Sequence, residues 1–132
     1  MTRSPERLIP FLEDREGWCF GYGVESRTHD CVRFVAAGVE AVTGVNRLEA
    51  IAPRWSTRIG ARRALTRMGG LAAAVDATGL PRVEPMLARR GDVALTDGEA
   101  LVLVEGDLVV GLAERGLYRL PRSAMVTAWA AD

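Results

Sequence analysis

The chain has 132 residues, of which 48% are hydrophobic and 26% are charged. This composition is typical of a globular protein and excludes a disordered or fibrous one. The length suits one domain that buries a core without disulfides or metal ions, so we expect residues 1–132 to form a single domain. All 17 basic residues are arginine, and 17 acidic residues balance them. The charge balance therefore supplies no net field that would draw the protein to nucleic acid or to an anionic membrane.

The sequence contains no readable membrane-spanning or secretory segment. Apolar runs such as Leu101 to Val104 reach at most five residues, whereas a spanning helix needs about 20. The residues from Met1 to Arg7 are not followed by the apolar stretch of a signal peptide. We therefore expect a protein that is made in the cytoplasm and whose two cysteines, Cys19 and Cys31, are free thiols.

The first half of the chain has the pattern of helices. Ser4-Pro5-Glu6 can open a helix that Pro10 keeps short or broken. An aromatic-rich loop follows over residues 17–28, and loops with so much aromatic surface are usually packed against other parts of a protein. Further on, Ser56-Thr57 predicts a helix that ends at Gly69-Gly70, and residues 71–78 predict one more short helix.

The strongest helix signal begins at Cys31. Thr28 or Asp30 can cap it, apolar residues recur at three-and-four spacing after it, and Gly44 supplies a stop. This pattern places Cys31 in the first turn, where the positive end of the helix dipole favours a thiolate. Cys31 is thus a candidate nucleophile, and the alternative is a small buried apolar residue.

From Val83 onward the sequence pattern changes to short apolar runs separated by turn residues such as Asp97-Gly98. The runs predict strands, and the turns between them are too short for parallel crossovers, so we expect an antiparallel meander. The tail can close against this sheet as a last strand or a short helix. Helices followed by strands predict an α+β domain, with N-terminal helices packed on a C-terminal antiparallel sheet. The expected strands are Val93 to Leu95, Leu101 to Val104, Leu108 to Leu112 and Leu117 to Leu120, and the tail is Met125 to Ala130.

Five short motifs follow one another along the chain: His29-Asp30-Cys31, Thr43-Gly44, Gly69-Gly70, Arg90-Gly91-Asp92-Val93 and Ala128-Trp129. Together they resemble the NlpC-type branch of the papain-like cysteine peptidases. More closely, their order resembles a small family of phage and prophage proteins whose members tend to be encoded among tail genes. The resemblance covers nearly the whole chain and implies a papain-like α+β fold.

The resemblance also implies how a cysteine peptidase would work here, and where this chain departs from one. In NlpC-type enzymes the helix cysteine is the nucleophile, and a histidine opening the strand after the Gly-Asp strand is its base. That position falls on Ala100, and alanine cannot accept the thiol proton. The remaining histidine, His29, is two residues from Cys31, and such neighbours do not face each other at a helix start. We therefore expect a degenerate peptidase, with Cys31 and His29 as its catalytic residues only if it is active.

Cofactor and metal sites are not indicated. Gly21-Tyr22-Gly23 lacks the remaining glycine of a dinucleotide fingerprint. Cys19, His29 and Cys31 could offer three ligands, but their spacing fits no common zinc pattern. Asp92 and Asp97 stand beside glycines at strand ends, where aspartate commonly bonds to a turn. We expect no cofactor and no metal ion.

The surface offers one candidate interface. Arginine is favoured at protein interfaces, and loop aromatics can serve the same purpose. The alternatives are a solvated arginine face and aromatic residues that pack on the core. The candidate interface residues are Trp18, Tyr22, Arg58, Arg62 and Arg67.

These observations lead to three functional hypotheses. The first is a non-enzymatic structural or assembly component of a phage tail near its tip, whose partners are other tail or hub proteins and which moves from the host cytoplasm into the virion. The second is an active cell-wall hydrolase that uses Cys31 on peptidoglycan. The third is a cytoplasmic tail-assembly chaperone or binding domain. No nucleic-acid partner is expected in any of them.

Overall fold

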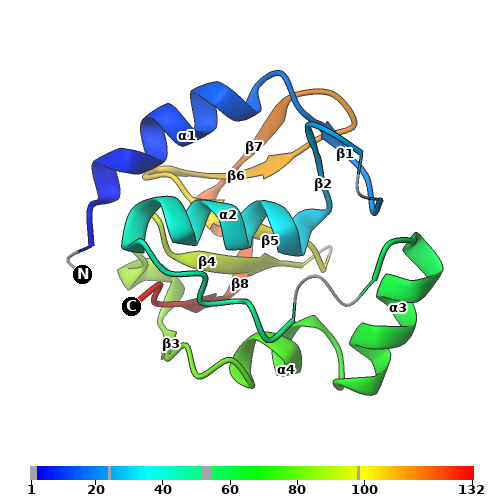
Figure 1. Cartoon of the computed structure of the whole chain (residues 1–132). Coiled ribbons are helices and arrows are strands. Elements are labelled where there is room, and N and C mark those ends of the chain that lie inside the picture. The colour runs from blue at the N-terminus through cyan, green and yellow to red at the C-terminus, as the bar shows by residue number, and fades with distance from the viewer. Residues whose placement is uncertain (1–2, 24, 52–54, 98) are drawn as a thin grey trace.

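The computed structural model describes residues 3–23, 25–51, 55–97 and 99–132. The predicted α+β class is confirmed, because the helices precede an antiparallel sheet along the chain. Figure 1 shows the helices α1 (Leu8–Arg15) and α2 (Cys31–Thr43) packed on one face of that sheet, with α3 (Arg58–Arg67) and α4 (Leu71–Asp76) beside it. Gly98 of the predicted turn lies outside the described residues.

The six-stranded sheet contains the predicted meander and two further strands. Its spatial order is β3-β8-β4-β5-β6-β7. The last strand does not follow β7 but returns to the other side of the meander and pairs antiparallel with β4. The tail is therefore a strand, and it lies inside the sheet. The strands are β3 (Arg82–Val83), β4 (Val93–Thr96), β5 (Leu101–Val104), β6 (Leu108–Leu112), β7 (Leu117–Pro121) and β8 (Met125–Trp129).

Helix α2 forms where the sequence predicts it. Asp30 Oδ1 accepts a hydrogen bond from the Arg33 amide at 2.9 Å, which caps the N-terminus. Gly44 ends the helix in the left-handed conformation, with φ of 81°. At Gly38 the helix approaches β5 so closely that an added Cβ would lie 2.3 Å from Leu103 Cδ1. This glycine lets α2 lie directly on the sheet.

The two faces of the sheet bury different sets of side chains. Alternation along β5 turns Leu101 and Leu103 toward α2 and turns Val102 and Val104 to the opposite face. The α2 face carries the larger cluster, which also includes the fully buried Phe34. Helix α2 is therefore packed on the sheet through its apolar residues.

The N-terminal part of the chain packs against α2. A 3-10 turn, η1 (Pro5–Arg7), leads into α1, and Pro10 is accommodated near the start of that short helix. The predicted aromatic loop contains two short strands, β1 (Cys19–Phe20) and β2 (Thr28–His29), which pair in parallel. Their pairing was not predicted, since two-residue strands carry too little pattern.

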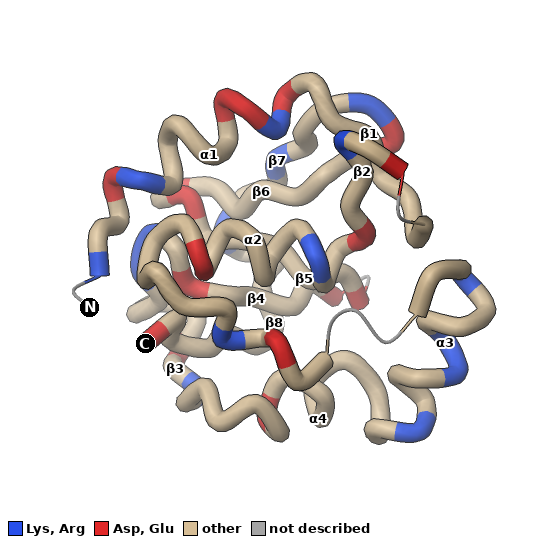
Figure 2. The backbone as a smooth tube through the Cα atoms, viewed as in Figure 1, with Lys and Arg blue, Asp and Glu red and all other residues tan. Residues whose placement is uncertain are grey.

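Helix α3 carries most of its charge on surface positions. Thr57 Oγ1 caps it by accepting a hydrogen bond from the Gly60 amide at 3.0 Å, as predicted. Only Ala61 and Ala64 are buried. Figure 2 shows basic positions recurring along this helix without an acidic one between them.

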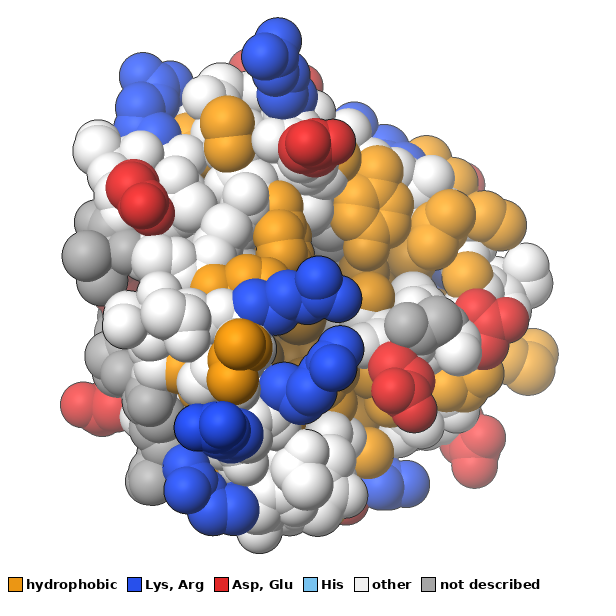
Figure 3. All heavy atoms as spheres, turned by 90° about the vertical axis from the view of Figure 1, so that its right-hand side faces the viewer, with side chains coloured by type: hydrophobic (Ala, Val, Ile, Leu, Met, Phe, Trp, Pro, Cys, Tyr) orange, Lys and Arg blue, Asp and Glu red, His pale blue; other side chains and the backbone are white. Residues whose placement is uncertain are grey.

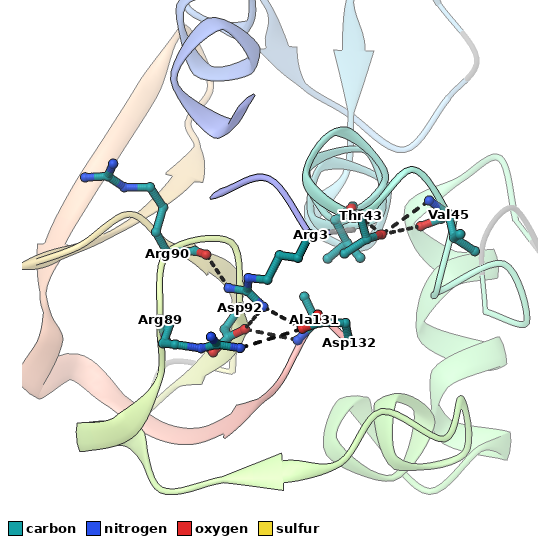
Figure 4. A network of polar contacts seen from close by, with 9 residues as sticks. Arg3, Thr43, Val45, Arg89, Arg90, Asp92, Ala131 and Asp132 are labelled. Carbon is teal, nitrogen blue, oxygen red and sulfur yellow. Dashed lines mark hydrogen bonds and ion pairs between the residues drawn. The ribbon is translucent and has the colours of Figure 1, made fainter. Parts of the chain in front are cut away.

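Asp92 joins the two ends of the chain (Figure 4). Its Oδ1 accepts hydrogen bonds from Arg3 Nη1 at 2.8 Å and from the Ala131 amide at 3.0 Å. Its Oδ2 accepts one from the Arg89 amide at 2.7 Å, which confirms the predicted turn bond. Arg3 Nη1 also donates to Asp132 Oδ1 at 2.8 Å. Asp92 is therefore a buried structural carboxylate at the entry to β4.

Candidate functional site

A buried carboxylate organises the start of α2. Asp30 is only 1% exposed. Besides capping the helix, its Oδ2 accepts hydrogen bonds from Trp55 Nε1 at 2.8 Å and from Arg33 Nη1 at 3.0 Å. Charge-assisted hydrogen bonds of this kind are among the stronger polar contacts in proteins. They fix the position of the residue that follows, Cys31.

Arg33 extends this network to the neighbouring loops. Its Nη1 donates to the Tyr22 carbonyl at 2.9 Å, and its Nη2 donates to the Trp55 carbonyl. One guanidinium thus holds the aromatic loop and Trp55 against α2, while it neutralises Asp30. The backbone at Tyr22 and Trp55 is therefore bonded to α2 two residues after Cys31.

Cys31 is half-buried, and its thiol does not have the character predicted from the helix dipole alone. Burial raises the pKa of the Cys31 thiol, whereas the nearby backbone amide of Leu101 opposes the rise. The Asp30 carboxylate raises this pKa further, and the amides of Cys31 and Val32 lower it. The net direction is upward, so burial and the adjacent anion outweigh the helix start. At neutral pH the protonated Cys31 thiol is therefore favoured over the thiolate.

Cys31 opens into a cavity of about 310 Å³ between the start of α2 and helix α3. Figure 3 shows this side of the molecule, where basic side chains gather around a hollow with a hydrophobic floor. The expectation of Cys31 as a simple core residue is therefore incomplete, because its side chain also lines a cavity. The cavity is lined by Tyr22, Asp30, Cys31, Val32, Trp55, Arg58, Ala61, Arg62, Leu65, Thr66, Gly70, Leu71 and Glu99.

The start of β5 adjoins Cys31. The residue before the strand, Ala100, occupies the histidine position implied by the resemblance, but it is not among the residues that line the cavity. Its two neighbours in the sequence take part in the site instead: Glu99 lines the cavity, and the Leu101 backbone amide lowers the pKa of the thiol. No described residue of this cavity is a histidine. The thiol therefore has an amide donor but no imidazole base.

His29 is held away from this cavity. Its ring stacks on Trp18 with the centroids 4.4 Å apart, and its Nε2 accepts a hydrogen bond from Arg15 Nε at 3.2 Å. It lines a second cavity, between α1 and α2, together with Arg15 and Arg33. Burial lowers the pKa of His29 to about 4, and the two arginines contribute to this fall. His29 and Cys31 thus belong to separate sites.

The predicted interface residues divide into two groups. Tyr22, Arg58 and Arg62 line the Cys31 cavity, so the structure brings three of them together with the thiol. Trp18 packs on His29, and Arg67 does not line the cavity. Burial raises the pKa of Tyr22 and the nearby Cys31 adds to the rise, while Arg58 and Arg62 oppose it.

Three contributors to the site were missed in the sequence: Trp55, Arg33 and Glu99. Trp55 follows a segment with little periodicity, so the sequence gives no sign that its indole bonds to Asp30. Arg33 stands three residues after its carboxylate, and this spacing on a helix is a readable signal for an ion pair. Glu99 lies in a turn with φ of 60°, which sequence patterns do not predict.

The described residues show neither a metal-binding cluster nor a membrane-spanning helix. Within them, His, Cys, Asp and Glu side chains do not gather in groups of three or more that could hold a metal ion. None of the helices described is both long and apolar enough to cross a membrane.

Comparisons with known proteins give a family. A search of curated proteins and a search of solved structures each returned no significant match. A family model described as a domain of unknown function (DUF6950) matches residues 2–131, which is nearly the whole chain. The chain therefore belongs to the DUF6950 family.

Proposed function

We propose that this chain is a non-enzymatic structural or assembly component of a phage or prophage-derived tail, placed near the tail tip, with a degenerate papain-like fold. Its partners are other tail or hub proteins, and it passes from the host cytoplasm into the virion. The tail context rests on the resemblance of the sequence motifs. The non-enzymatic character rests on one observation, which is that Cys31 has no imidazole beside it in its cavity.

Proton transfer decides between a binding domain and a hydrolase. Acyl transfer needs a base to take the thiol proton and an acid to protonate the leaving amine. Losing general acid–base assistance typically costs on the order of 100- to 10,000-fold in rate. The raised pKa of Cys31 reduces the thiolate further at neutral pH. Turnover of peptidoglycan by this site should therefore stay near background.

The second candidate, a cell-wall cysteine hydrolase, is favoured by one feature. Cys31 lies at a helix start and lines a cavity, as a peptidase nucleophile would. In that case Glu99, which lines the same cavity, would have to act as the base. A cytoplasmic assembly chaperone remains the third alternative.

One experiment separates the three functions. The Cys31→Ala substitution is introduced into the phage or prophage that carries the gene, and purified particles are analysed by quantitative mass spectrometry and plaque counts. A tail component should be present in particles, and plaque counts should be unchanged. Absence from the particles would favour the chaperone. Loss of infectivity together with Cys31-dependent release of stem peptides from cell walls would favour the hydrolase.

A further inference from the structure

One face of α3 forms a wall of the Cys31 cavity. The residues that line it follow helical spacing and place two cations, Arg58 and Arg62, at the rim. In the part of the chain that the structure describes, neither guanidinium forms an ion pair. Both are exposed. The rim thus has two cations that are available to an anion.

The acidic groups of the cavity do not cancel these cations. Asp30 is already neutralised by Arg33 and bonded to Trp55. Glu99 lies on the rim, but it makes no ion pair with an arginine among the described residues. The cavity mouth therefore carries a local excess of positive charge on a chain that is neutral overall.

The floor of the same cavity is apolar. Val32 comes from α2, Leu65 from α3 and Leu71 from α4, with Trp55 beside them. Sites with a hydrophobic floor and a few charged groups at the rim suit a segment that inserts one apolar side chain and pairs its flanking charges at the edge.

We propose that this cavity binds an acidic segment of a partner protein, which inserts one aliphatic side chain onto the apolar floor and places its flanking carboxylates on Arg58 and Arg62. This inference rests on the proposed function, since it names the chemistry by which a tail partner would dock. A basic segment would meet Arg58 and Arg62 as like charges.

A protein segment fits the cavity better than nucleic acid does. Nucleic-acid sites are commonly built on extended basic surfaces, whereas this chain has no net charge and places Glu99 on the same rim. The hydrophobic floor also suits an aliphatic side chain. An oligonucleotide therefore serves as a competitor in the test.

The test uses the purified, isotope-labelled full chain and amide chemical shifts. The probe is a blocked pentapeptide with a central leucine flanked by aspartates, and its counterpart carries lysines in place of the aspartates. Binding of such a short probe should fall in the millimolar range, so it is titrated to about 5 mM. The acidic peptide should shift the amides of Val32, Leu65 and Leu71, and the lysine peptide should not.

Helix α3 offers a matched control. Arg58→Glu/Arg62→Glu should weaken binding by about tenfold, because each rim pair becomes a repulsion. Arg63→Glu/Arg67→Glu adds the same charge on the same helix away from the cavity and should leave the affinity unchanged. If the first variant fails to fold, Arg58→Gln/Arg62→Gln tests the same contacts with neutral side chains.

Several results would overturn the docking proposal. They are absence of shifts at about 5 mM peptide, equal binding of the lysine peptide, equal loss in both pairs of variants, and displacement of the acidic peptide by oligodeoxythymidylate. None of them involves particles. If the chain enters particles but does not bind the peptide, the proposed function stands and the docking proposal fails. If the chain binds the peptide but is absent from particles, the docking proposal stands and the proposed function fails.

Discussion

The backbone amide of Leu101, the first residue of β5, lies close enough to the thiol of Cys31, the first residue of α2, to lower the pKa of that thiol. This proximity places the thiol beside the start of β5, directly after Ala100, the position that the sequence resemblance assigns to a histidine. The neighbouring side chains are Glu99 and Ala100, so the thiol is next to an amide and not an imidazole.

The buried carboxylate beside Cys31 should dominate local stability. Asp30→Ala removes the helix cap and leaves Arg33 and the Trp55 indole without their acceptor. We expect a loss of about 3–5 kcal/mol in the free energy of unfolding, measured by urea titration. Asp107→Ala, at an exposed position, should change it by less than about 0.5 kcal/mol. A loss at Asp30 as small as this control would contradict the network.

Strong local patterns were enough to predict the main elements. The capped apolar repeat predicted α2, and Thr57 with the glycine pair predicted α3. The meander followed from short turns between apolar runs. Each of these signals lies within a few neighbouring residues, where propensity and capping act.

Features that depend on distant contacts were not predictable. The place of β8 beside β4 depends on pairing across the sheet, and β3 contains only Arg82 and Val83. The helix start alone favours a thiolate at Cys31, whereas burial of the thiol, which depends on tertiary packing, raises its pKa. The cavity itself is formed by segments far apart in the sequence.

His29 should make stability depend on pH. Its pKa is lowered from 6.5 to about 4 by burial, with Arg15 and Arg33 contributing. The unfolded chain therefore binds more protons between these values. The stabilisation is complete above about pH 6.5 and is lost as the pH falls through about 4. Because the ring is half-exposed, we expect the free energy of unfolding to fall by about 1–2 kcal/mol over this pH range.

A pair of variants isolates this contribution. His29→Gln should flatten the fall in unfolding free energy between pH 6.5 and about 4. Asp76→Asn should act in a lower range, because the Arg82 hydrogen bonds lower the pKa of Asp76 from 3.8 to about 2. Urea titrations at a series of pH values measure both. If the unfolding free energy of His29→Gln fell with pH as steeply as that of the unchanged protein, His29 would not be the group responsible.

The contact between the chain ends should be stabilising. Arg3→Met leaves the Asp92 carboxylate buried without its ion pair, since the two side chains are 7% and 2% exposed. We expect a loss of about 2–4 kcal/mol in urea titration. Arg89→Met, at a 67% exposed side chain, should have little effect because its amide keeps the bond to Asp92. Equal losses of unfolding free energy in the two variants would show that the buried ion pair stabilises the fold no more than the exposed one does.

A histidine in the right place should activate the thiol. Glu99 lines the Cys31 cavity, whereas Ala100 is not among the residues that line it. Glu99→His should therefore raise the alkylation rate of Cys31 near pH 7, by about tenfold for each unit by which it lowers the thiol pKa. Ala100→His is the matched control and should have a smaller effect. The reverse order would show that Ala100 is the position facing Cys31.

The most direct test of a non-catalytic Cys31 is the pH dependence of its alkylation by iodoacetamide in the Cys19→Ser variant. Because burial raises the pKa of the Cys31 thiol above its ordinary value of 9.0, the rate should still be rising at pH 9.0. The urea-unfolded variant supplies the reference curve of an ordinary thiol. A rate that reaches its plateau at or below about pH 7 would reveal a stabilised thiolate, as in active cysteine peptidases, and would contradict the account.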